Sequence, residues 1–411
     1  MYPIYRYQES ANVEHVRLID SLRGLAAGLV LVSHVAFWTG ASHTDVVGGF
    51  LARGDAGVAI FFAISAFLLL SPTFALLLDP KSTRRTSWDA YALRRAARIL
   101  PAYWFAYAGV LVVGYLATTP DGVGSLKKIL AHIFLTQGFT TNKYQSFSQT
   151  WSLTTEVSFY VLVPFISWLL TRATRHGAAS VLSRVLSYIA FTALIGLLSQ
   201  ALAWFLMDSG TITLANALGT SALGHAAWFA VGAFVAVIVQ AQRQGLLTVE
   251  VNGLARYGRW LLNQDRSTVL LAACAVFVLA STPVAGPRNL DFPTLAESLI
   301  KEFLYALFAL LVLLAAIKPI PKGTSLDSYA KSGFNAWIGN TSYGVFLWHV
   351  LVLQLVFMTT GAELFNAGFG WTLQLVVTVT LAIASFSWFV VEKPILTFVR
   401  GRTTSARAQR D

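Results

Sequence analysis

Four short stretches of this 411-residue sequence place ionisable side chains inside or beside long apolar runs. The first is RLIDSLRGLAAGLVLVSHV, which carries Asp20, Arg23 and His34. Arg23 and His34 are eleven residues apart, about three helical turns or ~16 Å, so they lie on roughly one face of a helix. Because histidine titrates near neutral pH, His34 is a candidate general base or nucleophile. The alternatives are a packed histidine and a plain Asp20–Arg23 ion pair.

The second stretch, WDAYALRRAARILPAYW, is basic and contains Arg94, Arg95 and Arg98. Arg94 and Arg98 share a face because they are four residues apart. Guanidinium groups bind phosphate oxygens through paired hydrogen bonds, so this arginine trio suits the phosphates of a cytosolic acyl-CoA or nucleotide. We expect the trio to lie on a cytoplasmic loop, and the alternative role is ordinary positive-inside topology with contacts to anionic lipids. We expect Pro101 to begin the next apolar span.

The third stretch is QTWSLTTEVSFYVLVP, with Glu156 about five residues from the outer end of its apolar run, hence ~8 Å deep. A carboxylate at that depth needs a partner or a proton. By depth, His34 is the expected partner. Trp151, Ser152 and Tyr160 are candidate donors to an oxyanion that forms during the reaction.

The fourth stretch, SYGVFLWHV, contains Tyr343 and His349. If its span begins at residue 341, His349 lies eight residues in, ~12 Å from the cytoplasmic end. There it would contact a ligand that enters from the cytosol, with Tyr343 in support. A packing role for His349 fits equally well.

These residues must be positioned by membrane-spanning helices. Hydrophobic residues make up 56% of the chain and charged residues 12%, too few to cover a soluble globule. A helix needs ~20 apolar residues to cross ~30 Å of hydrocarbon. The single cysteine, Cys274, permits no intrachain disulfide. We therefore predict an all-α polytopic bundle of about ten transmembrane helices, with spans at 18–39, 57–78, 100–117, 151–171, 185–207, 222–240, 267–282, 299–317, 341–360 and 370–391.

The basic residues predict an orientation for this bundle. If the N-terminus is cytoplasmic, 23 of the 30 Lys and Arg lie in cytoplasmic segments and five in outer ones. We therefore expect a cytoplasmic segment at 1–17, a transmembrane domain at 18–395 and a basic cytoplasmic tail at 396–411 that lacks ordered structure. The outer loop at 118–150 contains an amphipathic piece, Leu126 to Phe139, suited to the membrane surface. This distribution explains the net charge of +11 without nucleic-acid binding.

Sequence signatures of soluble enzymes are missing. The chain contains no Walker A loop, HExxH pair, GxSxG elbow or GxGxxG fingerprint, and no histidines at metal-ligand spacing. We therefore expect neither a bound metal nor a bound cofactor. Since no soluble catalytic domain accompanies the spans, any chemistry is expected inside the bundle.

Together and in this order, the motifs resemble those of the acyltransferase 3 family of integral membrane acyltransferases, over nearly the whole chain. Arg23 to His34 is similar to the family's Arg-x10-His signature. GVAIFFAISAFLLL resembles the second-span motif, although Ala66 stands where glycine is usual. RRAARILPAYW, WSLTTEVSFY, SYGVFLWH and the closing VEKP, which ends at Pro394, also look like family motifs.

The resemblance implies transfer of an acyl group, commonly acetyl, from a CoA thioester to a hydroxyl of a carbohydrate or glycosylated acceptor. Some family members modify macrolides instead, so a secondary metabolite is the alternative acceptor. The expected partners are acyl-CoA, the acceptor and membrane lipids. The expected location is the cell membrane, most simply the cytoplasmic membrane of a bacterium.

The residues and the resemblance suggest one layout. CoA phosphates would dock on the arginine trio, and the pantetheine arm would pass Arg23 and His349. Near the outer leaflet His34, oriented by Glu156, would act as general base or briefly carry the acyl group. The rival hypothesis is a proton-coupled transporter or flippase of a lipid-linked glycan. That hypothesis predicts inverted repeats, which the sequence does not display.

Overall fold

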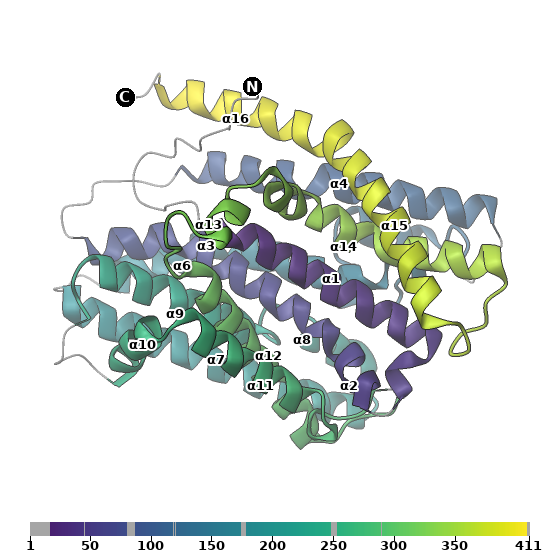
Figure 1. Ribbon diagram of the computed structural model, residues 1–411, viewed down its shortest axis with the longest axis horizontal. Coiled ribbons are helices and arrows are strands. Elements are labelled where there is room, and N and C mark those ends of the chain that lie inside the picture. Colours follow the sequence, from purple (N-terminus) through teal and green to yellow (C-terminus); the bar gives the residue numbers. More distant parts are fainter. Residues whose placement is uncertain are drawn as a thin grey trace.

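The computed structural model describes residues 17–44, 46–79, 87–117, 119, 121–173, 178–247, 253–288 and 290–408. Within these ranges the chain forms α-helices and short 3-10 turns, and it contains no β-strand. The helices run alongside one another in a bundle (Figure 1). The predicted all-α fold class is therefore confirmed.

Nine helical segments of the described chain are long and apolar enough to cross a membrane. Their helices are α1 (Leu18–Thr39), α3 (Gly57–Leu78), α4 (Trp88–Leu116), α6 (Trp151–Ala173), α7 (Ala178–Asp208), α9 (Ala226–Arg243), α12 (Leu295–Ile317), α14 (Gly333–Thr360) and α15 (Phe369–Ser387). The remaining predicted span is a bent pair, α10 (Gly253–Asn263) and α11 (Arg266–Ala280), with 109° between its two helices. The chain is thus a polytopic membrane protein, and its described ranges contain nine spans, or ten if the bent pair counts as one.

Helix α1 lies in the middle of the bundle, packed against both α14 and α3 (Figure 1). Small residues allow this close approach. A side chain at Gly57, the first residue of α3, would come within 2.3 Å of the Ala26 carbonyl oxygen on α1. Close helix packing through small residues is how membrane helices associate without a hydrophobic driving force. The helix that carries Arg23 and His34 is therefore held between two other helices, although Leu25 on it remains exposed.

Helices α1 and α14 run parallel and in register. At one end, Asn335 Nδ2 donates to the Arg17 carbonyl at 2.9 Å, and Ser21 Oγ donates to Asn335 Oδ1 at 2.6 Å. At the other end, the Phe365 amide donates to the Trp38 carbonyl at 2.8 Å. Residues at equal distances from the starts of α1 and α14 therefore lie at about the same level.

Three sequence expectations about the basic segments are wrong. Helix α4 begins at Trp88, so the arginine trio lies on a helix rather than in a loop, and Pro101 lies inside that helix. The segment after Pro394 is not without structure, because α16 spans Lys393–Ala408. Leu396 and Val399 of α16 pack against Ala97 of α4, which orders that helix. The expected cytoplasmic segment at 1–17 lies outside the described residues, apart from its last one.

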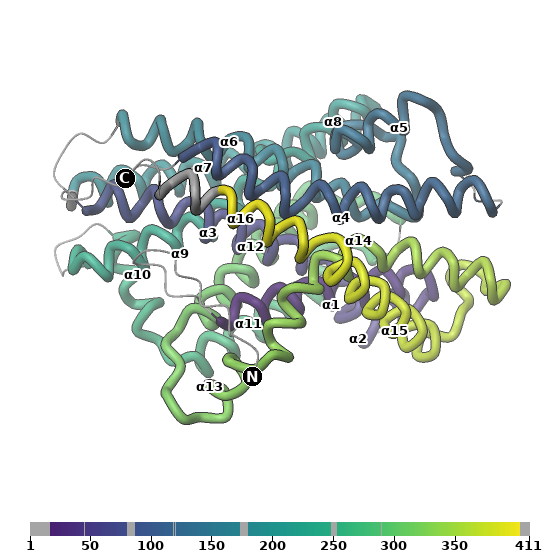
Figure 2. Tube along the Cα trace, turned by 90° about the horizontal axis from the view of Figure 1, so that it is seen from above, coloured from purple at the N-terminus to yellow at the C-terminus, as the bar shows by residue number. Residues whose placement is uncertain are grey.

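The loop at 118–150, which is predicted to be an outer loop, folds against one end of the bundle. It contains α5 (Leu126–Ile133) and the 3-10 turns Gln137–Phe139 and Gln145–Thr150. Helix α5 lies near α8 (Ile212–Gly219), and α8 packs on the first of those turns (Figure 2). Lys128 and His132 are buried, whereas Leu126, Leu130 and Phe134 are exposed. The amphipathic piece is thus helical in its first part, where the side chains of Leu126 and Leu130 face away from the protein, whereas Leu135 after the helix is buried.

Candidate active site

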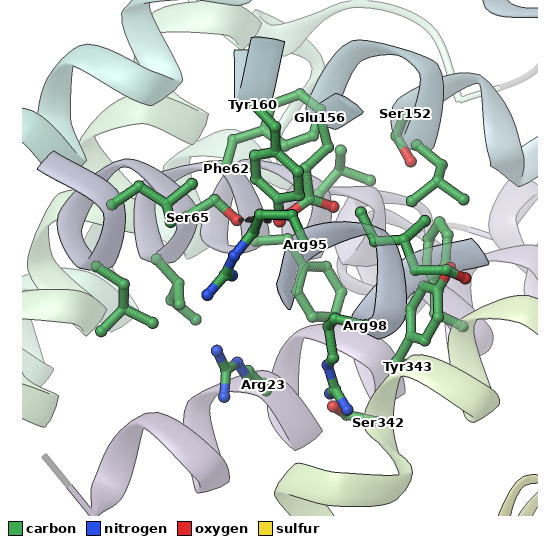
Figure 3. A pocket seen from close by; sticks show the side chains of 18 residues that line it. Arg23, Phe62, Ser65, Arg95, Arg98, Ser152, Glu156, Tyr160, Ser342 and Tyr343 are labelled. Atoms are coloured by element: carbon green, nitrogen blue, oxygen red, sulfur yellow. Dashed lines mark hydrogen bonds between the residues drawn. The ribbon is translucent and has the colours of Figure 1, made fainter. Parts of the chain in front are cut away.

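A narrow pocket of about 80 Å³ gathers three arginines from two helices. Arg23 comes from α1, and Arg95 and Arg98 come from α4. Glu156 and Tyr160 of α6 line the same pocket, and their side chains lie opposite the guanidinium groups (Figure 3). We call this space the arginine pocket. Since Arg95 and Arg98 are three residues apart, one face of α4 supplies both.

Arg98 is held from several sides. Its Nη1 lies 3.6 Å from Oε2 of Glu392, a carboxylate that is only 1% exposed. The guanidinium carbon also lies 5.8 Å from the ring centroids of Tyr343 and Trp388, within cation–π range. Tyr343 in turn donates to the Ile99 carbonyl at 3.1 Å. The closing VEKP motif therefore supplies the counter-ion of Arg98.

Arg23 and Arg95 differ in their partners. Arg23 Nη1 lies 3.6 Å from Oδ1 of Asp20, three residues earlier on α1. Arg95 lies 5.8 Å from the centroid of the Tyr160 ring. Its Nε is buried and has no hydrogen-bond partner within the described ranges. A buried donor without an acceptor is costly, so this atom marks a position where an anion would be stabilised.

The carboxylate of Glu156 does not bind His34. Its Oε1 accepts one hydrogen bond from Tyr160 at 2.6 Å and another from Ser65 of α3. The predicted pairing of Glu156 with His34 is therefore wrong. Equal depth in the membrane does not fix the position around the bundle: α6 packs on α3, and the neighbours of α1 include α3 and α14. Sequence reasoning also missed Ser65.

The partner of His34 is His349. The Nε2 atom of His349 lies 3.3 Å from Nδ1 of His34. Both residues are sixteen positions from the starts of their parallel helices, or ~24 Å. The predicted depth of ~12 Å for His349 is therefore wrong, because α14 begins at Gly333 rather than at 341. His349 stands beside the proposed base instead of near the cytoplasmic end.

Backbone carbonyls fix the protonation pattern of this histidine pair. Nδ1 of His349 lies 3.0 Å from the Val345 carbonyl, which can only accept, so this nitrogen carries a proton and Nε2 carries a lone pair. Nδ1 of His34 lies 2.9 Å from the Val30 carbonyl and donates for the same reason. In neutral His34 the lone pair is therefore on Nε2, which has no hydrogen-bond partner in the described part of the chain.

His34 lines a second and larger cavity of about 540 Å³, which we call the histidine cavity. Trp151, Asp55 and Lys301 also line it. The arginine pocket and the histidine cavity share two wall residues, Val58 of α3 and Phe346 of α14. Side chains rather than whole helices therefore separate them.

Sequence reasoning missed two polar clusters of the histidine cavity. Lys301 Nζ donates to Asp55 Oδ2 at 2.7 Å, and Tyr305 donates to the other oxygen of Asp55. His225 Nδ1 lies 3.3 Å from Glu302 Oε1. The available signal was the pair Lys301 and Glu302 inside an apolar run, since ionisable residues within spans are costly and therefore suggest function.

The remaining candidates divide between the two spaces. Trp151 lines the histidine cavity, whereas Ser152 lines the arginine pocket and donates to the Gln149 carbonyl at 3.0 Å. Arg94 is exposed on α4 and does not line the arginine pocket.

In the described ranges, no group of three His, Cys, Asp or Glu side chains is arranged to hold a metal ion.

Several known proteins are similar to this chain. Peptidoglycan O-acetyltransferase OatA of Listeria monocytogenes is 25% identical over 93% of this chain and 56% of its own length. Nodulation protein 10 of Rhizobium leguminosarum is 24% identical over 93% of this chain and 94% of its own. Exopolysaccharide production protein ExoZ of Rhizobium meliloti is 34% identical over 26% of this chain and 33% of its own.

The chain spans about half the length of the peptidoglycan O-acetyltransferase it matches. No solved structure matches it. A sequence profile described as an acyltransferase domain, that of acyltransferase 3, matches residues 16–391. This match includes the arginines of the pocket, the histidine pair and most of the bundle that positions them. The chain therefore belongs to the acyltransferase 3 family.

Proposed function

We propose that this protein is a membrane O-acyltransferase that moves an acyl group, most simply acetyl, from acyl-CoA to a hydroxyl of a carbohydrate or glycosylated acceptor. One observation carries this proposal: an arginine-lined pocket and a histidine-lined cavity share the side chains of Val58 and Phe346 as walls. A donor anchored in the first space needs to pass only those side chains to reach His34 in the second.

The arginine pocket is the proposed site of the donor. Arg23 and Arg98 have carboxylate partners, whereas Arg95 has no ion pair within the described ranges. Charge-assisted hydrogen bonds to phosphate are among the strongest polar contacts, and guanidinium groups suit them. A volume of about 80 Å³ has room for a phosphate or part of a pantetheine arm. The nucleotide of acyl-CoA would therefore lie outside this pocket, on the side from which the donor enters.

His34 is the proposed reactive group. In direct transfer, Nε2 takes the proton of the acceptor hydroxyl while its oxygen attacks the thioester carbonyl and the thiolate leaves. In a two-step reaction, Nε2 attacks the thioester itself and carries the acyl group to the acceptor. Either role needs the lone pair on Nε2, which the contacts of Nδ1 with Val30 and His349 favour. General-base catalysis contributes about 10²–10⁴-fold to the rate.

The histidine cavity is the proposed site of the acceptor. Its volume of about 540 Å³ lies in the range of about 300–1,000 Å³ that is typical of ligand sites. Trp151 offers an aromatic surface, and Asp55 and Lys301 offer hydrogen bonds to hydroxyls. The names of the relatives, which refer to peptidoglycan and exopolysaccharide, support a carbohydrate. We place acceptor entry on the outer side because the charge distribution puts His34 in the outer half of the membrane.

Mass spectrometry of surface glycans and small metabolites tests this function. Cells that carry the wild-type gene, no gene, or a His34→Ala variant are compared. We expect an ester of fixed mass on a surface glycan in the wild type alone, since the other two cells lack the reactive group. An ester that persists without the gene contradicts the proposal. An ester found only on a cytosolic metabolite keeps the catalyst but reverses the side of acceptor entry.

A further inference from the structure

The histidine cavity contains a second histidine whose orientation is fixed. His225 directly precedes α9, and Glu302 lies on α12. Nδ1 of His225 is 3.3 Å from Oε1 of Glu302. Both residues line the cavity that His34 also lines. The histidine–carboxylate pair expected between His34 and Glu156 thus occurs between two residues for which the sequence analysis had no role.

The contacts of His225 assign its protons. Gln200 Nε2 also lies 3.5 Å from Nδ1, but its two hydrogens are donated to the carbonyls of Gly219 and Gly224, each at 3.0 Å. With no hydrogen of Gln200 left for this nitrogen, we assign the Nδ1 proton of His225 to its contact with the carboxyl oxygen of Glu302. The lone pair of neutral His225 is then on Nε2, which has no hydrogen-bond partner in the described part of the chain.

The surroundings hold this pair in place. The imidazole of His225 stacks on Trp228 with 4.0 Å between ring centroids, and its centroid lies 5.3 Å from that of Trp151. Trp228 Nε1 donates to the Glu302 backbone carbonyl at 3.0 Å. His225 is only 7% exposed and Glu302 only 5%. A buried ionisable pair on a cavity wall is costly to keep, which favours a functional role.

We infer that His225, positioned by Glu302, is a second catalytic residue, which takes the proton of the acceptor hydroxyl while His34 carries the acyl group. This inference rests on the proposed function and decides between its two chemical routes. The two histidines differ in their partners. Glu302 contacts the His225 ring directly, whereas His34 contacts the Val30 carbonyl and the ring of His349, and the Asp55 carboxylate on the same cavity wall is bound by Lys301 and Tyr305. These contacts assign the proton-accepting role to His225 and the nucleophilic role to His34.

Each step balances. First, Nε2 of His34 attacks the thioester carbonyl, the C–S bond breaks, and its electron pair leaves with sulfur as the CoA thiolate, which water protonates on the donor side. Next, the acceptor oxygen attacks the acyl carbon, its proton moves to Nε2 of His225, and the C–N bond breaks. The electron pair of that bond returns to His34. The acceptor leaves as the ester, and His225 releases its proton to water.

A single-turnover experiment tests this assignment. Purified full-length wild type, His225→Asn, Glu302→Gln and the control His43→Asn are each mixed with acetyl-CoA that is radiolabelled in the acetyl group. His43 lies on a 3-10 turn and does not line either space. Asparagine at 225 keeps an N–H for Glu302 but has no group that accepts a proton. Labelled protein and free CoA are measured after rapid quenching. The surface-glycan fraction that the wild type acetylates is then added.

We expect His225→Asn to release about one equivalent of CoA and to become labelled, as the wild type does. Discharge of the label to the glycan fraction should be about 10²–10⁴-fold slower than in the wild type. Glu302→Gln should slow discharge by a smaller factor, because a neutral amide still orients the ring but stabilises its imidazolium less. His43→Asn should match the wild type at both steps.

Three outcomes overturn the inference. These are discharge from His225→Asn at the wild-type rate, a folded His225→Asn that never becomes labelled, and a wild type that acetylates the glycan without a labelled intermediate. Elution and thermal melting in detergent report whether each variant is folded. If His225→Asn is not folded, the rate at which Glu302→Gln discharges its label is the test instead. A wild type that releases no CoA and acetylates no glycan refutes the proposed function instead, which keeps the two failures distinct.

Discussion

The arginine pocket and the histidine cavity are neighbours with opposite characters. The pocket is narrow, and two of its three arginines are held by the carboxylates of Asp20 and Glu392. The cavity is larger and contains two histidines whose lone pairs are left unoccupied. Charged side chains with fixed positions suit the binding of a ligand. Imidazole nitrogens with oriented lone pairs suit proton transfer or nucleophilic attack. The difference supports the proposal that one space anchors the donor and the other performs the chemistry.

The strongest test of this proposed division is removal of His34, the proposed reactive group. His34→Ala should lower acyl transfer by about 10³-fold or more, because neither base catalysis nor acyl carriage remains. The affinity for acyl-CoA should stay near that of the wild type, since the guanidinium groups are untouched. Transfer is measured with labelled acetyl-CoA, and affinity is measured by equilibrium binding. Loss of both together would mean that one space performs both tasks.

The converse test changes the donor pocket. Arg95→Ala should raise the KM for acyl-CoA by about 10–100-fold, the loss expected for a charge-assisted hydrogen bond worth about 1.5–3 kcal/mol. Its kcat should fall much less. Arg94→Ala is the matched control, because Arg94 is exposed and does not line the pocket. Equal KM values for the two variants would favour a general lipid-contact role for this basic stretch.

Arg98→Lys sharpens the same comparison. Lysine keeps the positive charge beside Glu392 but lacks the planar fork, so the KM for acyl-CoA should rise by several-fold while membrane insertion stays normal. An unchanged KM would assign Arg98 to structure, as the partner of Glu392 and the Tyr343 ring.

Glu156→Gln should have a smaller effect, about 10-fold on transfer. The amide keeps one acceptor for the hydroxyls of Tyr160 and Ser65 but loses the charge that faces the arginines. Because Glu156 lies on the donor side, the change should appear in the KM for acyl-CoA rather than in the discharge of an acyl group. Steady-state kinetics at several donor concentrations separate the two. A change in kcat alone would contradict this prediction and would indicate that Glu156 acts in the chemical step at His34.

The least demanding test concerns the side on which each space opens. In a Cys274→Ser background, cysteines introduced at residues 81–86 should react with an impermeant maleimide only after permeabilisation, since the basic segments are predicted to be cytoplasmic. A cysteine at His43 should react in intact cells. The opposite labelling pattern would show that the predicted orientation is reversed. The proposed donor and acceptor would then enter from the opposite sides, and the two spaces would be unchanged.

Much of this arrangement could be predicted from the sequence. Apolar length alone gave the spans, and span depth correctly put His34 well inside the bundle. Lateral neighbours could not be predicted in this way. Glu156 and His34 have similar expected depths, yet Glu156 bonds to Ser65, and His34 bonds to His349. Depth gives the position of a residue along the membrane normal. Which residues pair also depends on which helices are neighbours, and only helix packing determines that.

The predicted starts of the helices were the second source of error. Polar residues such as Asn335 begin α14 before its apolar run, so hydropathy placed the start too late and His349 too shallow. The Glu302–His225 pair was missed for a related reason: α9 and α12 are distant in sequence, and no local pattern joins them.

The equal count of sixteen residues in α1 and α14 has a consequence for how this chain can change in length. One residue inserted between Leu18 and His34 would turn the imidazole by about 100° around the helix axis and shift it by 1.5 Å. His34 would then face away from His349, although every side chain near the pair would still be present. Insertions and deletions should therefore be rejected between Arg23 and His34, because this stretch of α1 fixes the distance between the arginine pocket and the imidazole of His34.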